Sequence, residues 1–297
     1  MELPTTFFGI HCKGFVMTPI SEVIRRRCSC RTYADRPVEE DALHHFTQAI
    51  HAPQQGPFGH TPRFLLLSIT SLSRDDWKKL GTYGVIKHAR LYMAGMIRPA
   101  PMAACDFGFC MEKLILEATR LGLGTCWLGG TFSIGAFADA TGLRREEELP
   151  AVTPVGHPAD RRSLTERTMR RFAGSDHRKP WPDLFFQDNL SAPLSADEAG
   201  PYAEALENVR LAPSASNKQP WRVVYDKKRQ IFSFYISRAF GYRHLRDISL
   251  QDIDMGIAMC HFDLTVNEMG LKGSWLREDA PATIKPLEHV AGWQAGV

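Results

Sequence analysis

Residues 106–128 read DFGFCMEKLILEATRLGLGTCWL, and residues 254–276 read DMGIAMCHFDLTVNEMGLKGSWL. The two segments align without a gap at a constant offset of 148 residues, from 106 to 254. The identical pairs are Asp106 and Asp254, Gly108 and Gly256, Met111 and Met259, Leu116 and Leu264, Gly122 and Gly270, Leu123 and Leu271, Trp127 and Trp275, and Leu128 and Leu276. A repeat of this length predicts two copies of one domain rather than the short units of a solenoid.

The first segment predicts a helix followed by a buried strand. Apolar residues recur at helical spacing over 106–121, and Gly122 follows as a typical helix terminator. The next run, LGLGTCWLGG, is short, apolar and aromatic, so we expect a strand that ends at Gly129 and Gly130. A P-loop or a dinucleotide fingerprint needs the order strand, glycine loop, helix, and the sequence contains neither motif.

A second echo lies upstream of each helix. APQQGPFGHTPRFLLLSI (52–69) and APSASNKQPWRVVY (212–225) each combine a Pro-rich loop with a β-rich run. The later loop offers Ser214, Asn217 and other polar side chains between two prolines. Taken alone, such a loop is equally typical of a simple turn between a helix and a strand.

A connecting arm is predicted between the copies. Residues 172–200 are rich in Pro, Ser and Asp. We place the boundary near Ser191, after the apolar residues 184–186, which we expect to dock on a neighbouring domain. The predicted domains are 1–190, the first copy with the arm, and 191–297, a shorter second copy.

The composition is that of an ordinary soluble globular protein, with 297 residues, 44% hydrophobic and 23% charged. The formal net charge of +3 is too small for a general nucleic-acid binder. The longest charge-free run, 121–138, is rich in glycine, so we expect no membrane partner. Seven cysteines without ligand spacing, and a start without a signal-peptide pattern, predict a cytoplasmic protein with reduced thiols and no metal site.

Arginines surround Ser29 where a helical stretch, PISEVIRRR, gives way to CSCRTYADRPV. Arg27, Ser29 and Arg31 alternate, so in an extended segment their side chains point the same way. Two guanidinium groups and a hydroxyl on one face can cradle a phosphate, because planar guanidinium forks bind its oxygens in pairs. The alternative is a solvated basic surface, and the arginine run alone does not decide between the two.

Taken in order, the RxSxR segment, the Ala-Pro loop, the long helix and GLGTCWLGG resemble the nitroreductase family of FMN-dependent oxidoreductases. The resemblance spans roughly residues 20–290 and implies an α+β fold. In this family two subunits build flavin sites at their interface. The chain resembles a branch in which two fused copies form an intramolecular pseudo-dimer, so that a monomer suffices. The resemblance implies FMN as cofactor, NADH or NADPH as electron donor, and a small organic acceptor, nitroaromatic or quinone-like.

The resemblance also assigns cofactor-binding roles to residues from both copies. They are Arg27, Ser29 and Arg31 for the FMN phosphate and ribityl chain, Gly129 and Gly130 for backbone N–H groups near flavin N5, Pro213, Ser214 and Asn217 for the loop from the second copy, and Arg178 and Lys179 for a late basic pair at the phosphate. No side chain is assigned a catalytic role, because the flavin carries the chemistry.

Each motif stands intact in only one copy. The first-copy loop, with Phe58 and His60, lacks the Ser and Asn pattern, the second copy has no RxSxR, and GLKGSWLRED has no glycine pair. We therefore expect one FMN per chain and a vestigial second pocket. The insertion between residues 71 and 102 offers further candidates to line the open flavin face: Trp77, Tyr83, Lys87 and Tyr92. For any one of the aromatic residues, core packing is the more common role.

Two alternatives to the enzyme remain at this point. One is a non-catalytic flavin-binding protein for storage or sensing. The other is a scaffold that binds no flavin and uses the arginines for a different phosphorylated ligand. Flavin content and reduction by a nicotinamide cofactor separate the three.

Overall fold

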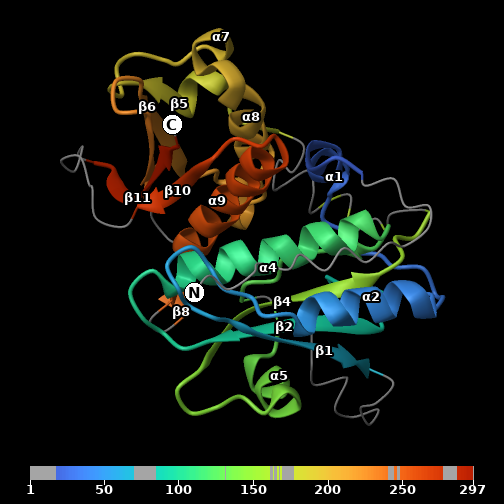
Figure 1. The fold of residues 1–297 in the computed structure, drawn as a ribbon. Coiled ribbons are helices and arrows are strands. Elements are labelled where there is room, and N and C mark those ends of the chain that lie inside the picture. The colour runs from blue at the N-terminus through green and yellow to red at the C-terminus, as the bar shows by residue number, and fades with distance from the viewer. Residues whose placement is uncertain are drawn as a thin grey trace, which may run out of the picture.

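The computed structural model describes residues 18–69, 85–130, 132–160, 163, 166, 168, 177–239, 244–245, 248–276 and 286–296. Two long helices, α4 (Ala103–Arg120) and α9 (Leu250–Glu268), cross at the centre of the molecule. Figure 1 shows one β-sheet on each side of this pair. No helix in the described ranges is long and apolar enough to cross a lipid bilayer.

The first sheet has the strand order β1-β2-β4-β3, with every pair antiparallel. Its strands are β1 (Arg63–Ser68), β2 (Leu91–Ile97), β3 (Gly124–Thr125) and β4 (Glu148–Gly156). Helix α2 (Glu40–His51) packs beside α4 on one face of this sheet (Figure 1). Helix α5 (Ile134–Thr141) covers the other face, where Phe137 packs in a second apolar cluster.

The second sheet has the order β10-β11-β7-β6-β5. Its strands are β5 (Phe185–Gln187), β6 (Trp221–Asp226), β7 (Ile231–Ile236), β10 (Gly273–Leu276) and β11 (Glu288–Ala295). A separate pair is formed by β8 (His244–Leu245) and β9 (Ile248–Ser249). Four of the five strands repeat the antiparallel order of the first sheet, matched in their order along the chain.

Strand β5 is the extra member of the second sheet. It pairs parallel to β6, with Phe185 opposite Val223. Leu184 and Phe185 are fully buried there, which agrees with the expectation that residues 184–186 dock on a neighbouring unit. The boundary near Ser191 stays a prediction.

The remaining helices are short. They are α1 (Ile20–Arg26), α7 (Ala196–Ala199) and α8 (Ala203–Leu211), with 3-10 turns η2 (Trp181–Asp183), η3 (Gly200–Tyr202) and η4 (Ala215–Asn217). Helices α1 and α8 pack on each other, and α8 packs on α9.

The repeated segment folds close to its prediction. Helix α4 begins at Ala103, three residues before the predicted start, and Gly122 follows its end with the left-handed φ of +76° that a helix terminator adopts. The strand after it is shorter than predicted. Only Gly124 and Thr125 form β3, and Leu128 adds an isolated bridge to Val152.

Helices α4 and α9 approach closely because each has a glycine at the crossing. A Cβ on Gly108 would lie 2.1 Å from the carbonyl oxygen of Ile253, and a Cβ on Gly256 would lie 1.9 Å from that of Cys105. Cys105 and Ile253 are themselves separated by the repeat offset of 148 residues, so the two contacts are reciprocal. Only a residue without a side chain fits at either position.

Candidate functional site

The segment 27–31 leaves α1 in an extended conformation along the edge of the first sheet. The Cys30 N–H donates to the Thr125 carbonyl at 2.8 Å, and Ser29 forms a β-bridge with Thr125. On the other side, the Lys87 N–H donates to the Arg31 carbonyl at 2.8 Å. The backbone of the predicted cradle is therefore fixed from two directions.

The alternating side chains of this segment face one buried thiol, that of Cys126. Burial raises the pKa of Cys126, while the charges of Arg31 and Arg27 and a hydrogen bond with Ser29 act in the opposite sense. Cys30, between them in sequence, is buried in the same apolar cluster as Cys126 and Tyr33. The side chains of Arg27, Ser29 and Arg31 all act on this one thiol, which agrees with the predicted alternation.

The two arginines of the cradle have unused hydrogen-bond donors. Arg27 Nε and Arg31 Nε and Nη1 are buried and have no hydrogen-bond partner within the described part of the chain. The nearest carboxylate oxygen to Arg27 is Glu112 Oε1, at 3.9 Å from Nε, and the Arg27 side chain is only 7% exposed. Buried guanidinium donors without acceptors are costly, so the arrangement fits an anionic group such as a phosphate.

Gly129 and Gly130 follow the Cys126 segment and meet the start of α9. A Cβ on Gly129 would lie 2.9 Å from Leu250 Cδ2, and Gly130 has a φ of +96°. Glycine is needed at Gly130 for the left-handed backbone, whereas a side chain at Gly129 would require only the Leu250 side chain to shift. The backbone of this turn is thus held against the second half of the chain.

The loop 212–221 lies one turn further along α9. The Ala215 N–H donates to Asp254 Oδ1 at 2.9 Å, and the Gln219 N–H donates to Ser214 Oγ at 2.8 Å. Ser216, Asn217 and Gln219 all have positive φ values near 50°. Such a cluster of left-handed residues other than glycine is strained and is typical of functional loops. The first two turns of α9 therefore bring together the glycine pair and this loop, which come from different halves of the chain.

Arg178 and Lys179 belong to an earlier segment of the chain and contact the loop 212–221. Arg178 donates to the Leu211 carbonyl at the end of α8, at 3.2 and 3.3 Å, and to Asn217 Oδ1 at 3.2 Å. The Lys179 N–H donates to Gln219 Oε1 at 2.8 Å, and burial lowers the pKa of the Lys179 amine. These contacts make the pair a clamp on the loop, and its predicted role at the phosphate stays a prediction.

The first-half loop is held differently from its counterpart. The Phe58 and His60 N–H groups donate to the two carboxylate oxygens of Asp106, at 3.0 and 2.9 Å. Asp106 is the repeat equivalent of Asp254, so both loops are fastened by the same position of the central helix.

The four further candidates from the insertion between residues 71 and 102 have different surroundings. Tyr92 is buried and packs edge-on against Phe137, at 5.6 Å between ring centroids, so its role is core packing. Lys87 is exposed and lies beside the Arg31 backbone. Trp77 and Tyr83 lie outside the described residues.

A buried carboxylate, Glu112 on α4, escaped the sequence analysis. Trp127 Nε1 donates to Glu112 Oε2 at 2.7 Å, and His261 Nε2 lies 2.9 Å from Oε1. The available signal was a glutamate inside an apolar helix pattern, with a tryptophan conserved between the two copies after each helix. His261 belongs to the other copy, and sequence periodicity gives no means of pairing it with Glu112.

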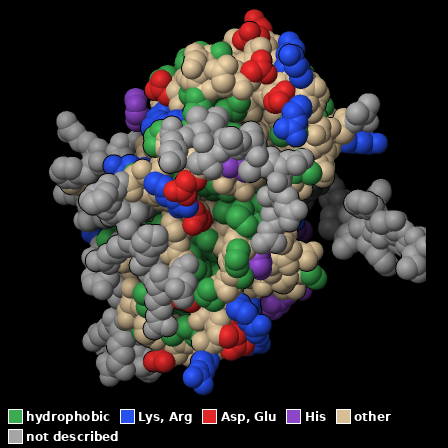
Figure 2. Space-filling view, turned by 90° about the vertical axis from the view of Figure 1, so that its left-hand side faces the viewer, with side chains coloured by type: hydrophobic (Ala, Val, Ile, Leu, Met, Phe, Trp, Pro, Cys, Tyr) green, Lys and Arg blue, Asp and Glu red, His purple; other side chains and the backbone are tan. Residues whose placement is uncertain are grey.

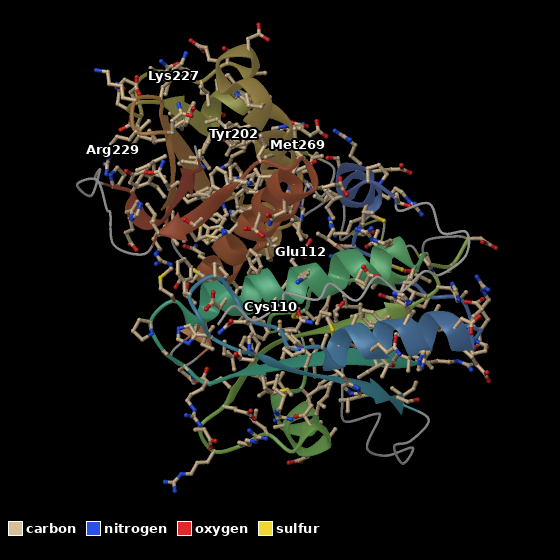
Figure 3. All side chains as sticks on the ribbon, in the orientation of Figure 1. Cys110, Glu112, Tyr202, Lys227, Arg229 and Met269 are labelled. Atoms are coloured by element: carbon tan, nitrogen blue, oxygen red, sulfur yellow. The ribbon has the colours of Figure 1, made fainter. Side chains whose placement is uncertain are left out.

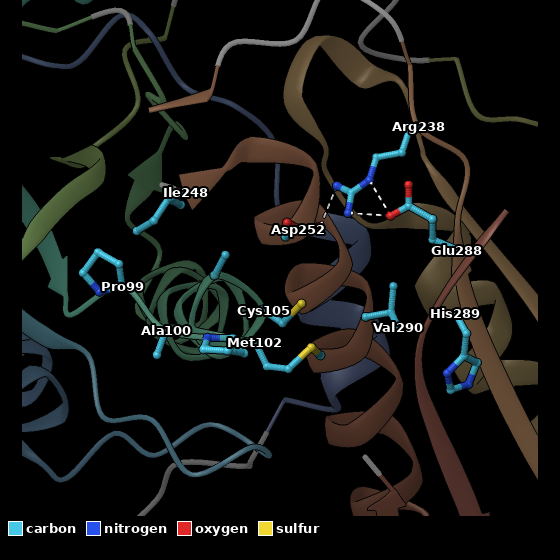
Figure 4. A pocket seen from close by; sticks show the side chains of 12 residues that line it. Pro99, Ala100, Met102, Cys105, Arg238, Ile248, Asp252, Glu288, His289 and Val290 are labelled. Carbon is cyan, nitrogen blue, oxygen red and sulfur yellow. Dashed lines mark hydrogen bonds and ion pairs between the residues drawn. The ribbon is translucent and has the colours of Figure 1, made fainter. Parts of the chain in front are cut away.

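A cavity of about 540 Å³ opens where α4 and α9 begin. Figure 4 shows Arg238 at its rim, bound to Asp252 at 2.7 Å and to Glu288 at 2.9 Å. Figure 2 shows hydrophobic side chains gathered between the two halves on this side of the molecule. None of the ten predicted cofactor-binding residues lines this cavity.

The sequence matches the family model described as "Putative TM nitroreductase" over residues 19–266. A solved structure described as a "putative nitroreductase" from Thermotoga maritima is similar over 96% of this chain and 98% of its own, with 18% identity and a TM-score of 0.60. This likeness confirms the predicted α+β, nitroreductase-like fold.

Shorter solved structures match about half of the chain. A nitroreductase from Desulfovibrio desulfuricans in complex with FMN is 24% identical and covers 50% of this chain and 95% of its own, with a TM-score of 0.39. An FMN-dependent nitroreductase from Clostridium difficile is 16% identical and covers 48% of this chain and 88% of its own, with a TM-score of 0.39. No curated protein matches the sequence. Since the family model spans well over half of its residues, the chain belongs to this nitroreductase family.

Proposed function

We propose that this protein is an FMN-dependent oxidoreductase that takes reducing equivalents from NADH or NADPH and passes them to a nitroaromatic or quinone-like acceptor. The observation that carries the proposal is a set of buried guanidinium donors, Arg27 Nε and Arg31 Nε and Nη1, which lie beside Ser29 and have no partner among the residues that the structure describes. An FMN phosphate supplies the charge and the acceptor oxygens that these donors lack. Membership of the nitroreductase family and the FMN of related proteins support the same cofactor.

Different residues bind different parts of the cofactor. Arg27, Ser29 and Arg31 hold the phosphate and ribityl chain. The backbone N–H groups of Gly129 and Gly130 lie toward flavin N5, where a donor stabilises the negative charge that the ring gains with hydride. The loop with Pro213, Ser214 and Asn217 covers the flavin from the second half, and Arg178 and Lys179 hold that loop in place. The flavin, when bound, supplies the redox chemistry.

The two halves form a tandem duplication that acts as a pseudo-dimer, divided near Ser191. Three observations support this part of the proposal. The two sheets share one strand order, Gly108 and Gly256 make reciprocal contacts, and Asp106 and Asp254 each fasten a loop of their own half. On this view a monomer contains the whole flavin site, because both sides of the interface belong to one chain.

The visible spectrum of protein purified without added cofactor tests the proposal. We expect the absorbance of bound flavin, and bleaching when NADH or NADPH is added under anaerobic conditions. Bound flavin that neither nicotinamide reduces would favour the storage or sensing alternative. Absence of flavin, together with no binding of added FMN, would overturn the proposal.

A further inference from the structure

Glu112 lies on the side of α4 that faces the second half of the chain (Figure 3). Its side chain is completely buried, and three donors surround it. Trp127 Nε1 lies 2.7 Å from Oε2 and His261 Nε2 lies 2.9 Å from Oε1, whereas Arg27 Nε lies 3.9 Å from Oε1. The carboxylate is therefore bound closely by two groups and only approached by the arginine of the cradle.

His261 is fixed on its far side as well. Its Nδ1 lies 2.8 Å from the Asn208 carbonyl oxygen, which can only accept, so Nδ1 carries a hydrogen and the ring is held in one orientation. Asn208 in turn donates to Ser21 Oγ at 2.7 Å and to Thr265 Oγ1 at 2.9 Å. The position of Nε2 next to Glu112 is thus set by contacts from α1, α8 and α9.

The separation between Glu112 and Arg27 is unusual for a buried pair. A guanidinium and a carboxylate in a dry interior attract each other strongly and normally close to a direct hydrogen bond. Here Arg27 Nε has no hydrogen-bond partner among the described residues, although the carboxylate is 3.9 Å away and both side chains are buried. The Trp127 N–H bond to Oε2 and a proton shared between His261 Nε2 and Oε1 account for the restraint on the carboxylate.

We infer that His261 is a positioning residue of the cofactor site, which holds Glu112 back from Arg27 and so keeps Arg27 Nε free for a phosphate. The inference rests on the proposed function for the identity of that phosphate. At 3.9 Å the carboxylate still offsets the buried charge of Arg27 without occupying its donors. If His261 is removed, the carboxylate closes on Arg27 and competes with the ligand.

This arrangement predicts that Glu112→Gln reverses the effect of removing His261 on phosphate binding. In Glu112→Gln, the amide oxygen can still accept from Trp127, and the amide N–H can donate to His261 Nε2. The amide carries no charge with which to capture Arg27. Removal of His261 should therefore damage phosphate binding only while residue 112 is a carboxylate.

The experiment is a double-mutant cycle of His261→Phe and Glu112→Gln, read by titration with FMN and with riboflavin, which lacks the phosphate. We expect His261→Phe to lower the ratio of FMN affinity to riboflavin affinity about tenfold. We expect the double variant to recover most of that ratio. Equal losses for both flavins, or a loss that Glu112→Gln does not rescue, would show that His261 is merely structural.

A matched tryptophan pair provides a milder variant if His261→Phe does not fold. Trp127→Phe removes the other bond that restrains Glu112, and we expect it to lower the same ratio, again with rescue by Glu112→Gln. Trp275→Phe is the control, because its indole donates to Asp263 at 2.9 Å in the second half, away from the cradle. A similar fall of the ratio in both tryptophan variants would overturn the inference.

Failure of the proposed function gives a different result from failure of this inference. If the unmodified protein binds neither flavin, the proposed cofactor is wrong. In that case the same variants are compared by the increase in Tm that inorganic pyrophosphate produces. This measurement tests the arginine donors directly. If His261→Phe reduces this increase in Tm and Glu112→Gln restores it, the inference is supported in this assay too. If His261→Phe leaves the increase unchanged, or Glu112→Gln does not restore it, the inference is refuted.

Discussion

Arg25 and Arg27 lie two residues apart in opposite surroundings. Arg25 is half exposed and pairs with Glu204 at 2.6 Å, whereas Arg27 is 7% exposed and its Nε has no hydrogen-bond partner in the described structure. The difference arises because α1 ends at Arg26, so that Arg25 lies on the helix surface and Arg27 begins the extended segment. The same stretch of chain therefore carries one arginine in a surface ion pair and one that is proposed to bind the cofactor.

We predict that Arg27→Ala lowers FMN affinity about tenfold to a hundredfold, because it removes charged donors to the phosphate. Arg25→Ala should leave FMN affinity unchanged, since an exposed ion pair contributes little. Fluorescence titration of the two variants with FMN measures the difference. Equal affinities would mean that the side chains of the segment do not alternate around the ligand.

The sequence predicted the features that depend on local patterns. The helical period of residues 106–121, the terminator Gly122 and the alternation of Arg27, Ser29 and Arg31 all follow from spacing within a few residues. The constant offset of 148 residues also predicted a second long helix, which is present as α9. These signals survive in a single sequence because they require no knowledge of tertiary contacts.

The features that the sequence did not predict depend on pairing across the fold. Strand β3 is only two residues long, since the Cys126 N–H donates to the Thr153 side chain instead of to the backbone of β4, and backbone pairing returns only at Leu128. The parallel pairing of Phe185 with Val223 joins the arm to the second sheet. The contact between Glu112 and His261 unites two different helices, and neither residue has an identical counterpart in the other copy.

The helix crossing gives a test of the close approach of α4 and α9. We predict that Gly108→Ala and Gly256→Ala each destabilise the protein by about 1–3 kcal/mol or more, because the new methyl group would overlap a backbone carbonyl that cannot move aside alone. Gly135→Ala in α5 is the matched control, since nothing lies within 4 Å of its Cβ position. That change should be neutral or stabilising by up to about 1 kcal/mol. Chemical denaturation measures all three.

We predict one FMN per chain. In the described part of the chain the arginine cradle, the glycine pair and the strained polar loop each occur once, and the glycine pair and the loop meet around the start of α9. The absorbance of flavin released on denaturation, divided by the protein concentration, gives the stoichiometry. A ratio near two would contradict the prediction and would mean that the second half retains a working pocket.

The hydrogen bonds between Arg178 and the loop 212–221 lead to a prediction about its role. The substitution Arg178→Ala removes the hydrogen bonds of this side chain to the Leu211 carbonyl and the Asn217 amide oxygen, so the strained loop should become less ordered. We expect weaker binding of both FMN and riboflavin, because the loop covers the flavin rather than the phosphate alone. A loss restricted to FMN would instead assign Arg178 to the phosphate. Titration with both flavins distinguishes the two roles.

The equivalent acids Asp106 and Asp254 should respond in opposite ways to the change to Asn. Asp106 accepts a backbone N–H on each oxygen, from Phe58 and His60, and an amide can accept only one of them. Asp106→Asn should therefore destabilise the protein by about 1–3 kcal/mol. Among the described residues Asp254 Oδ1 accepts from the Ala215 N–H and Oδ2 is buried without a hydrogen-bond partner, so Asn keeps the Ala215 bond and removes a buried charge.

The pH dependence of stability provides the measurement for Asp254. Burial raises the pKa of Asp254 well above its usual range, so the folded protein favours the protonated carboxyl. The stability associated with this group is fully present below its unfolded pKa, about 3.9, and is lost as the pH rises toward the folded value. Asp254→Asn has no such loss. The free energy of unfolding of Asp254→Asn, minus that of the unmodified protein, should therefore increase from pH 4.5 to pH 8.5, a window of roughly four pH units that begins above the unfolded pKa. Urea denaturation across that range measures it, and parallel curves for the two proteins would show that Asp254 does not titrate as its burial requires.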